Sequence, residues 1–351
     1  MNLKEIRKKI DSIDGQILQL LNARMEQVLM TTAFKNEVED INREKELLNR
    51  LKHRQTGLVQ TGFIEKIYNE IIHESKRLQH DPHDLIAFQG EHGAYSEEAS
   101  ILWKSRLVPF PCRSFAEVFE GLQSGLYEYG IVPVENTLGG SVDQVNHLLI
   151  HTDLHVVGAV ELRVHHCLLA VPGTDHREIR SAHSHPQALS QCRRFLARNH
   201  LEPVPYTDTA GAAKMLAETR PKRSAAIAGS LCAHLYDLEI LKEDIEDIER
   251  NITRFLVLSR EKATADGDKC SIVFVTEHKA GTLFNVLQVF AEKAINLTRI
   301  ESIPNEPGDY AFFLDFEGSD RERPVREALT EVERITTQFR LMGCYTERRV
   351  Q

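Results

Sequence analysis

Two cations near the start of the chain lie on a helical face that is otherwise apolar. The apolar residues recur at alternating steps of four and three: Ile6, Ile10, Ile13, Ile17 and Leu20. Arg24 and Lys35 continue this face, and on one continuous helix they lie about 16 Å apart along the axis. A cation on a packing face is costly unless an anion meets it. The pair therefore predicts a site for one small, doubly charged anion.

A third cation on the same helix suggests that two chains build this site. Arg7 lies about 25 Å from Arg24 and about a quarter turn away, too far for one small ligand to touch both. An antiparallel partner helix would bring a second Arg7 to the site. The sequence therefore predicts an intertwined homodimer or a higher homo-oligomer.

The two helices expected next also carry polar residues on inward faces. Asp40 is a predicted N-cap, with Arg43 and Glu44 one turn inside that helix. Ser75 and Gln79 continue the apolar face of the following helix. For any one of these residues the alternative is a salt bridge across a helical bundle, such as Arg24 with Glu44. Their joint placement favours a binding site.

Four polar motifs further along occur at expected strand ends, where α/β folds place ligands. They are Gly90-Glu91-His92-Gly93-Ala94-Tyr95-Ser96, then Pro133-Val134-Glu135-Asn136-Thr137, then Ser184-His185-Pro186-Gln187, and Asn251-Ile252-Thr253-Arg254-Phe255. Taken singly, each motif is also typical of turns and helix caps. His183 and His185 lack the carboxylate or thiolate support of a metal site, so we predict no metal.

Three segments must position these residues. Residues 1–80 are expected to be helical, and residues 85–260 alternate short apolar runs with helical stretches, which is typical of α/β folds. Residues 269–351 suggest the order strand, helix, strand, strand, helix, strand of a ferredoxin-like α+β domain. There, Gly281, Thr282 and Leu283 begin a helix whose amides suit a carboxylate, and Glu301 and Ser302 end the next strand.

Composition excludes several classes of function. The net charge of −9 argues against nucleic acid as a partner, and no stretch is apolar enough to span a membrane. The six scattered cysteines are expected to be reduced thiols of a cytoplasmic protein.

The helical segment resembles the all-helical class of chorismate mutases. The resemblance implies that Arg24, and Arg7 of the other subunit, hold the two carboxylates of chorismate. Lys35 and Gln79 would hydrogen-bond the ether oxygen of the breaking bond. The ring hydroxyl and its surroundings would be fixed by Asp40, Arg43, Glu44 and Ser75. A pericyclic rearrangement needs no nucleophile or metal, only a held conformer and charge stabilisation.

The four motifs, in this order, resemble prephenate dehydratase, with Thr253-Arg254-Phe255 as the most specific element. The resemblance implies a two-lobed, periplasmic-binding-protein-like α/β fold, a cleft between the lobes and no cofactor. It places Thr253 near the leaving hydroxyl, as its proton donor or only polarising it. Arg254 would clamp a carboxylate, and the cleft would be lined by Glu135, Asn136, Ser184 and Gln187.

The C-terminal segment resembles an ACT domain, an amino-acid sensor. The resemblance implies phenylalanine as an allosteric inhibitor bound at residues 281–283 and 301–302, with Ile303 where the family pattern has arginine. Together the three segments predict a bifunctional enzyme from chorismate through prephenate to phenylpyruvate. Two alternatives are a dehydratase whose helical segment only dimerises, favoured by the short Lys35–Asp40 segment, and a non-catalytic binding protein. Arogenate is a further possible substrate.

Overall fold

The chain folds into two compact units, Met1–Asp84 and Leu85–Gln351. A computed structural model describes residues 2–34, 38–54, 57–263, 266–304 and 310–349. Among the helices of the described residues, none combines the length and the apolar character that crossing a bilayer requires.

The first unit is helical, as the sequence predicts. It contains α1 (Leu3–Met30), the 3-10 turn η1 (Thr31–Phe34), α2 (Ile41–Arg54) and α3 (Thr61–His80). The predicted N-cap of α2 is confirmed, since the Asp40 carboxylate accepts a hydrogen bond from the Arg43 amide at 2.9 Å. The spacing assumed for Arg24 and Lys35 was wrong in one respect: α1 ends at Met30 and gives way to a tighter turn. Lys35 itself lies outside the described residues.

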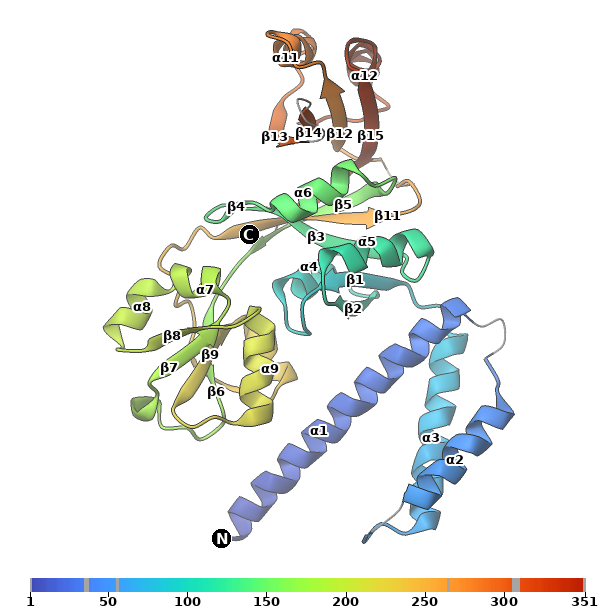
Figure 1. The fold of residues 1–351 in the computed structure, drawn as a ribbon, viewed down its shortest axis with the longest axis vertical. Coiled ribbons are helices and arrows are strands. Elements are labelled where there is room, and N and C mark those ends of the chain that lie inside the picture. The colour runs from blue at the N-terminus through green and yellow to red at the C-terminus, as the bar shows by residue number, and fades with distance from the viewer. Residues whose placement is uncertain (1, 35–37, 55–56, 264–265, 305–309, 350–351) are drawn as a thin grey trace. The chain divides into compact units, whose positions relative to one another are not determined.

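The N-terminal half of α1 leaves its apolar face uncovered. The C-terminal half of α1 packs on α3, where Leu29 and Ile72 are buried. Nearer the N-terminus, α1 diverges from α2 and α3 (Figure 1). Exposure there is 39% for Ile6, 51% for Ile10, 54% for Ile13, 50% for Ile17 and 71% for Leu20.

The second unit begins with a lobe built on a seven-stranded mixed sheet of order β16-β5-β11-β3-β1-β2, with β4 paired to β3. Its strands are β1 (Leu85–Gln89), β2 (Val108–Cys112), β3 (Tyr129–Asn136), β4 (Gly140–Ser141), β5 (His155–Arg163), β11 (Ile252–Ser259) and β16 (Glu347–Arg349). Its helices are α4 (Tyr95–Trp103), α5 (Phe115–Ser124) and α6 (Asp143–Ile150). Strands β1, β2 and β3 are parallel, whereas β11 is antiparallel to both β3 and β5.

A second lobe is inserted between β5 and β11, on a five-stranded sheet of order β10-β6-β9-β7-β8. Its elements are β6 (Cys167–Ala170), the 3-10 turn η2 (His176–Glu178), β7 (Ser181–Ser184), α7 (Pro186–Gln191), α8 (Arg193–Arg198), β8 (Glu202–Pro205), α9 (Thr209–Thr219), β9 (Ser224–Ala228), α10 (Ser230–Leu235) and β10 (Glu239–Lys242). The chain crosses between the lobes twice, after β5 and before β11. This is the predicted two-lobed α/β architecture.

The C-terminal domain has the predicted ferredoxin-like order. It comprises β12 (Lys269–Thr276), α11 (Thr282–Glu292), β13 (Leu297–Pro304), β14 (Tyr310–Glu317), α12 (Arg323–Ile335) and β15 (Gln338–Tyr345), in the sheet order β13-β14-β12-β15. Helices α11 and α12 cover one face (Figure 1), where Phe274, Phe290 and Leu314 form the core. The other face lies against β5 and α6 of the first lobe.

Two findings differ from the sequence-based expectation. After β15 the chain leaves this domain, and β16 (Glu347–Arg349) joins the first lobe's sheet beside β5, so the predicted domain 269–351 is not self-contained. Cys270 and Cys344 form a disulfide, so the prediction of six reduced thiols was wrong for this pair. The two residues are far apart in sequence but directly opposite each other on β12 and β15. Cys112, Cys167, Cys192 and Cys232 are free and buried, as expected for reduced thiols.

Candidate active sites

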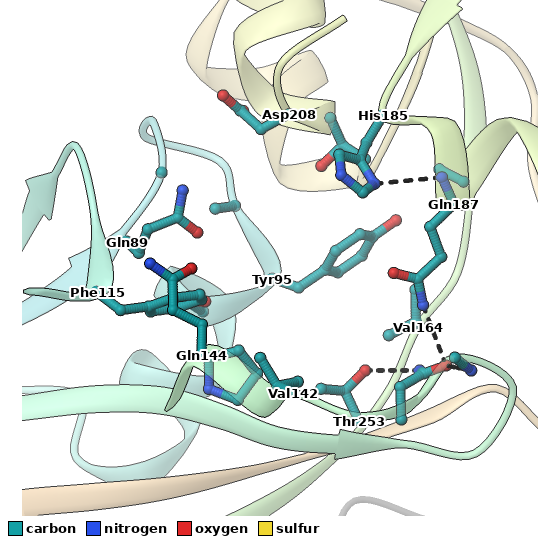
Figure 2. Close-up of a pocket in the computed structure, with 18 of the residues that line it drawn as sticks. Gln89, Tyr95, Phe115, Val142, Gln144, Val164, His185, Gln187, Asp208 and Thr253 are labelled. Carbon is teal, nitrogen blue, oxygen red and sulfur yellow. Dashed lines mark hydrogen bonds between the residues drawn. The ribbon is translucent and has the colours of Figure 1, made fainter. Parts of the chain in front are cut away.

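A cavity of about 640 Å³ lies between the two lobes, and all four sequence motifs contribute to its lining. The contributing residues are Gly90, Ala94, Tyr95, Ser96, Pro133, Asn136, His185, Gln187, Thr253 and Phe255. Figure 2 shows His185 and Asp208 of the second lobe across the cavity from Thr253 and Gln144 of the first. The sequence-based expectation that the motifs converge is therefore confirmed, because strand ends from both lobes meet at one cleft.

Asn136 orients the hydroxyl of Thr253. The side-chain oxygen of Asn136 accepts hydrogen bonds from the amides of Leu138 and Gly139 at 3.0 and 2.8 Å. This fixes the amide nitrogen on the other side, where it donates to Thr253 Oγ1 at 2.9 Å. Because Thr253 is the acceptor in this contact, its own hydroxyl proton is not used there, and Thr253 lines the cavity. Gln187 Nε2 lies 3.5 Å from the Asn136 oxygen at the cavity wall.

A chain of hydrogen bonds leads from Asn136 to Tyr95. Asn136 Nδ2 donates to Asn251 Oδ1 at 2.7 Å, and Asn251 Nδ2 donates to Gln191 Oε1 at 3.0 Å. His166 Nε2 lies 2.8 Å from the same Gln191 oxygen, so Nε2 carries the proton. Burial lowers the pKa of His166, so the ring is neutral, and its Nδ1 lies 2.8 Å from the Tyr95 hydroxyl, which donates to the His165 carbonyl at 2.7 Å. This series of hydrogen bonds connects residues of both lobes to the cavity wall that carries Thr253.

Four helices of eight or more residues begin at the cavity wall. The lining includes Ala94 and Tyr95 at the start of α4, and Ser114 and Phe115 at the start of α5. It also includes the starts of α6 and α9. Helix N-termini attract anions through their amides and dipoles. Arg113, just before α5, adds a charge to the same wall.

Sequence reasoning missed Arg113 and His166. The segment Ser114-Phe115-Ala116-Glu117 has the sequence pattern of a capping box: Ser114 Oγ accepts from the Glu117 amide at 3.2 Å, and the Glu117 carboxylate accepts from the Arg113 amide at 2.8 Å. That motif could have revealed the helix start behind Arg113. His166 carries no comparable signal, since only the fold brings it to Gln191.

The predicted role of Arg254 as a carboxylate clamp is contradicted by the structure. Side chains alternate along a strand, so Thr253 and Phe255 face the cavity while Arg254 faces the C-terminal domain. Its side chain is 4% exposed and pairs with Asp315 and Glu347 at 2.5 Å each. Burial opposes the charge on Glu347, but Arg254 and Lys269 hold its pKa below the ordinary value.

Glu135 and Ser184 are likewise not where the prediction needs them. Glu135 is paired in register with Arg254, faces the same way, and lies 3.5 Å from Arg299 of β13. Ser184 is fully buried, and its hydroxyl donates to the Ile227 carbonyl at 2.6 Å. Neither residue belongs to the cavity lining, so we withdraw both as substrate contacts.

Three predicted residues of the helical unit lie along the contact of α1 with α3. Arg24 is half-buried, burial lowers its pKa, and its Nη1 donates to the buried Ser75 hydroxyl at 2.5 Å. Gln79 Nε2 donates to Thr31 Oγ1 at 2.7 Å. The suggested bridge between Arg24 and Glu44 is not formed, because Glu44 pairs with Lys76 at 2.8 Å.

Three other predicted residues of this unit, Arg7, Asp40 and Arg43, lie at the surface. Asp40 and Arg43 are exposed, and Arg43 lies 3.7 Å from Glu46. Arg7 is exposed on α1. Since α1 is continuous over 28 residues, Arg7 and Arg24 of one chain cannot contact the same small ligand. This separation is the premise of the predicted dimer.

The predicted sensor residues lie on two elements of the C-terminal domain. Gly281 is the N-cap of α11 with φ +89°, a conformation that favours glycine, and the Thr282 hydroxyl donates to the Lys279 carbonyl at 3.0 Å. On β13, Glu301 is half-buried and Ser302 is exposed. Ile303 is buried, so it packs in the domain and does not present a polar group.

Three family models match the chain in succession. Residues 6–80 match chorismate mutase type II, residues 86–263 match prephenate dehydratase, and residues 271–334 match the ACT domain. The chain therefore belongs to the prephenate dehydratase family and also carries a mutase domain and an ACT domain.

Individual relatives refine this assignment. The bifunctional chorismate mutase/prephenate dehydratase of Escherichia coli (strain K12) is 31% identical over 374 residues, covering 99% of this chain and 97% of that protein. The Arabidopsis thaliana protein named arogenate dehydratase/prephenate dehydratase 2, chloroplastic, is 40% identical over 274 residues, covering 74% of this chain and 72% of that protein. The solved structure of the Arthrobacter aurescens prephenate dehydratase in complex with L-Phe has a TM-score of 0.70 and 29% identity, covering 75% of this chain and 89% of that one.

The match to the E. coli protein spans all three domains in the same order. This chain is thus a member of the bifunctional chorismate mutase/prephenate dehydratases.

Proposed function

We propose that this chain rearranges chorismate to prephenate in its helical unit and converts prephenate to phenylpyruvate in the cavity between its α/β lobes. Phenylalanine would inhibit the second step by binding the C-terminal domain. The observation that carries the proposal is the Thr253 hydroxyl, which is held by Asn136 at the wall of a cavity of about 640 Å³. A cytoplasmic location remains our prediction.

The dehydratase step needs one proton and two groups that bind the carboxylates of prephenate. The ring hydroxyl leaves with a proton as water, the bond from the ring to its carboxylate breaks, and the released electron pair completes the aromatic ring. The products are phenylpyruvate, carbon dioxide and water. Thr253 is positioned to donate a hydrogen bond or a proton to the departing oxygen, and solvent restores that proton. Asn136 and Gln187 keep this wall of the cavity oriented.

We assign the binding of the substrate carboxylates to Arg113 and to the N-termini of α4 and α5, in place of Arg254. The start of α9 is less suitable, because its N-cap Asp208 carries a carboxyl group at the cavity. Burial raises the pKa of this carboxyl, but a second anion there would still be disfavoured at neutral pH.

For the mutase we assign Arg24 to a chorismate carboxylate, with Ser75 orienting its guanidinium. Gln79, with Lys35, would hydrogen-bond the ether oxygen, and Glu44 would contact the ring hydroxyl. Asp40 and Arg43 begin the helix that carries Glu44. A second copy of the chain would supply Arg7.

The exposed stripe of α1 supports the dimer. Fully burying an isoleucine side chain is worth about 1.5–3 kcal/mol, so half-exposed Ile10, Ile13 and Ile17 would each gain roughly 1 kcal/mol on association. A partner helix that covers this stripe in antiparallel direction brings its own Arg7 toward Arg24.

The sensor assignment rests on family membership and on the two motifs. The relative from Arthrobacter aurescens was solved in complex with L-Phe. In this chain, the start of α11 at Gly281, Thr282 and Leu283 would hold the ligand's carboxylate. Glu301 and Ser302 of β13 would hold its amino group.

One experiment separates these activities. The purified chain is incubated with chorismate, with prephenate or with arogenate, each with and without phenylalanine, and the aromatic products are identified. We expect phenylpyruvate from the first two and inhibition of the prephenate reaction by phenylalanine. Turnover of prephenate without consumption of chorismate would reduce the helical unit to a dimerisation element. Faster turnover of arogenate would change the assigned substrate.

A further inference from the structure

Two side chains of the second lobe lie across the cavity from Thr253 and take no part in the steps described so far. His185 precedes α7 and Asp208 precedes α9, and both line the cavity. Figure 2 shows both side chains on the wall opposite Thr253. The pair therefore lies where the end of the substrate that is remote from its hydroxyl would be bound.

His185 offers a hydrogen-bond donor at this wall. Its Nδ1 accepts from the Gln187 amide at 3.2 Å, so the proton of the neutral ring is on Nε2. Within the described residues, no protein atom accepts that proton. Two other basic side chains line the cavity: Arg113 is assigned to a carboxylate, and the ring nitrogens of His166 face Gln191 and Tyr95 at 2.8 Å each.

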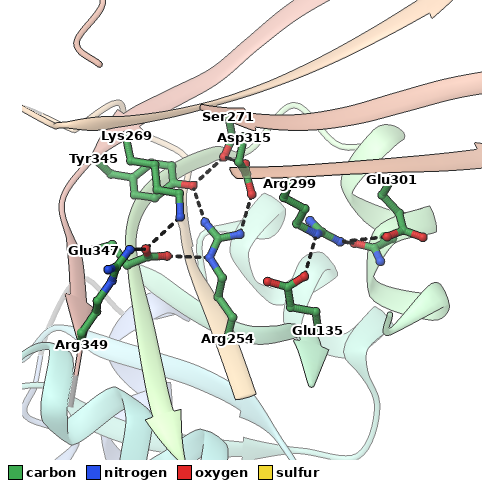
Figure 3. A network of polar contacts seen from close by, with 11 residues as sticks. Glu135, Arg254, Lys269, Ser271, Arg299, Glu301, Asp315, Tyr345, Glu347 and Arg349 are labelled. Carbon is green, nitrogen blue, oxygen red and sulfur yellow. Dashed lines mark hydrogen bonds and ion pairs between the residues drawn. The ribbon is translucent and has the colours of Figure 1, made fainter. Parts of the chain in front are cut away.

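The arginines on the other side of the sheet cannot take this role. Figure 3 shows the guanidinium of Arg254 held by Asp315, Tyr345 and Glu347, away from the cavity. Arg299 lies on the same side of the sheet as Arg254 (Figure 3), and neither arginine lines the cavity. His185 is therefore the basic lining residue whose donor is still available to a ligand.

Asp208 offers a negatively charged acceptor on the same wall. Its carboxylate caps α9 by accepting from the Gly211 amide at 2.6 Å. Burial raises the pKa of Asp208, the Gly211 amide opposes this, Glu91 adds to it, and His185 opposes it. Lys214, on the same helix, pairs with Glu91 at 2.8 Å. Among the described residues Asp208 has no ion-pair partner, so a cationic group of a ligand would meet an unpaired carboxylate there.

The chemistry of the substrate decides what meets this pair. The hydroxyl and the leaving carboxylate are carried by opposite carbons of the ring, and the carbon with the carboxylate also carries a short side chain. With the hydroxyl at Thr253, that side chain extends toward the opposite wall. In prephenate it contains a ketone, which accepts a hydrogen bond, whereas in arogenate an ammonium group, which donates one, stands at the same carbon. A site that hydrogen-bonds one of these groups discriminates against the other.

We propose that His185 and Asp208 determine which of these substrates the cavity takes: His185 Nε2 donates to the ketone of prephenate, and Asp208 binds the ammonium group of arogenate. This inference rests on the proposed dehydratase function. The two residues act in opposite directions, because a donor disfavours an ammonium group and a carboxylate disfavours the prephenate dianion. The balance between them sets the selectivity of the chain.

The test for His185 uses two substitutions that separate its cap from its donor. For the full-length wild type, His185→Asn and His185→Gln, kcat and KM are measured with prephenate. Asparagine can still cap α7 but does not reach as far as Nε2, whereas glutamine brings an amide donor to that distance and is a poor cap. We expect His185→Asn to lower kcat/KM about tenfold, the effect of one lost hydrogen bond. His185→Gln should recover most of this loss.

The test for Asp208 measures arogenate as a competitor of prephenate turnover. Asp208→Asn keeps a cap for α9 and removes the charge. It should raise the competitive inhibition constant of arogenate about 10–100-fold, as expected for a lost hydrogen bond to a charged group. The KM for prephenate should fall about threefold, because a like charge is removed from the site.

Two controls lie in the same lobe but outside the cavity lining. Asp175→Asn changes another capping carboxylate, which accepts from the Arg177 amide at 3.0 Å. His183→Asn changes a histidine two positions before His185. Neither control should alter the constants for prephenate or arogenate.

Four results would decide against the proposal or its basis. Wild-type kinetics in His185→Asn would remove His185 from recognition. Equal losses in His185→Asn and His185→Gln, in proportion to lowered melting temperatures, would reduce His185 to a structural contact. Arogenate that does not compete, or competes equally well in Asp208→Asn, would show that Asp208 does not bind the ammonium group. A wild-type chain without prephenate turnover would overturn the proposed function instead, and calorimetric binding of arogenate to the wild type and to Asp208→Asn would then still test the pair.

Discussion

Replacing Thr253 by valine tests the central assignment with the smallest change of shape. Valine keeps the branched side chain and exchanges the hydroxyl for a methyl group. The fold loses one hydrogen bond, because Asn136 Nδ2 no longer has Thr253 Oγ1 as an acceptor at 2.9 Å. The same nitrogen keeps Asn251 Oδ1 at 2.7 Å and the Ile252 carbonyl at 3.3 Å. The amide therefore stays satisfied and oriented.

The expected magnitudes separate stability from catalysis. Losing one neutral hydrogen bond costs about 1 kcal/mol of unfolding free energy, which lowers the melting temperature of a domain of this size by about 2–4 °C. A positioned proton donor contributes about 10²–10⁴ in rate, or roughly 3–5 kcal/mol of activation free energy. Thr253→Val should therefore melt almost like the wild type and lose at least about a hundredfold in kcat.

Thr253→Ser is the matched control, because it keeps the hydroxyl that Asn136 orients. We expect it to retain the rate within about tenfold, below the loss from removing the donor. Phenylpyruvate formation from prephenate is measured for all three proteins, with the melting temperature of each protein as the measure of its folding. A kcat for Thr253→Val within threefold of the wild type would remove the hydroxyl from the mechanism.

Three further outcomes are expected. Arg24→Met should lower the mutase kcat/KM by about 10–100-fold, which corresponds to the free energy of one hydrogen bond to a charged group. Prephenate turnover should not change. Parallel loss of both activities would contradict separate sites. Reduction of the Cys270–Cys344 disulfide should lower the unfolding free energy by up to about 4 kcal/mol, which would be measured as a lower melting temperature with reductant. The melting temperature of a Cys270→Ala/Cys344→Ala variant should not respond to reductant. Equal melting temperatures of the wild type with and without reductant would refute this prediction. Because burial lowers the pKa of His166 below that of the unfolded chain, its stabilisation is fully present above about pH 6.5 and is lost as pH falls toward the folded value. Unfolding free energy should therefore drop between pH 7 and pH 5 in the wild type and less in His166→Asn, and identical pH profiles would contradict it.

Local patterns in the sequence were sufficient to predict the elements. The steps of three and four from Ile6 to Leu20 predicted α1, and Asp40 marked the start of α2 because a carboxylate before a helix caps its amides. The short apolar runs predicted β1, β3, β5, β6, β9 and β11, and the order of elements after residue 269 was that of the ferredoxin-like fold. The second strand of the first lobe, β2, escaped because Val108–Cys112 contains two prolines and has no alternating pattern.

Motifs fixed which residues lie near the cavity, but not which way each one points. Thr253, Asn136 and Gln187 were placed correctly at the cavity wall. Arg254 and Glu135 share those motifs and face the other way, because neighbouring side chains on a strand alternate and the sheet is covered on both faces. Ser184 ends its strand as expected, yet its hydroxyl donates a hydrogen bond to the Ile227 carbonyl of the adjacent strand and does not reach the cavity.

The sequence by itself thus determined most of the secondary structure, the three segments and the set of polar groups available for chemistry, since these depend on residues a few positions apart. Only the tertiary structure decided the partners of Arg254, the pairing of Cys270 with Cys344 and the return of β16 to the first lobe's sheet. Each of these joins residues separated by more than sixty positions. Such contacts depend on how whole sheets pack, and no local spacing encodes that geometry.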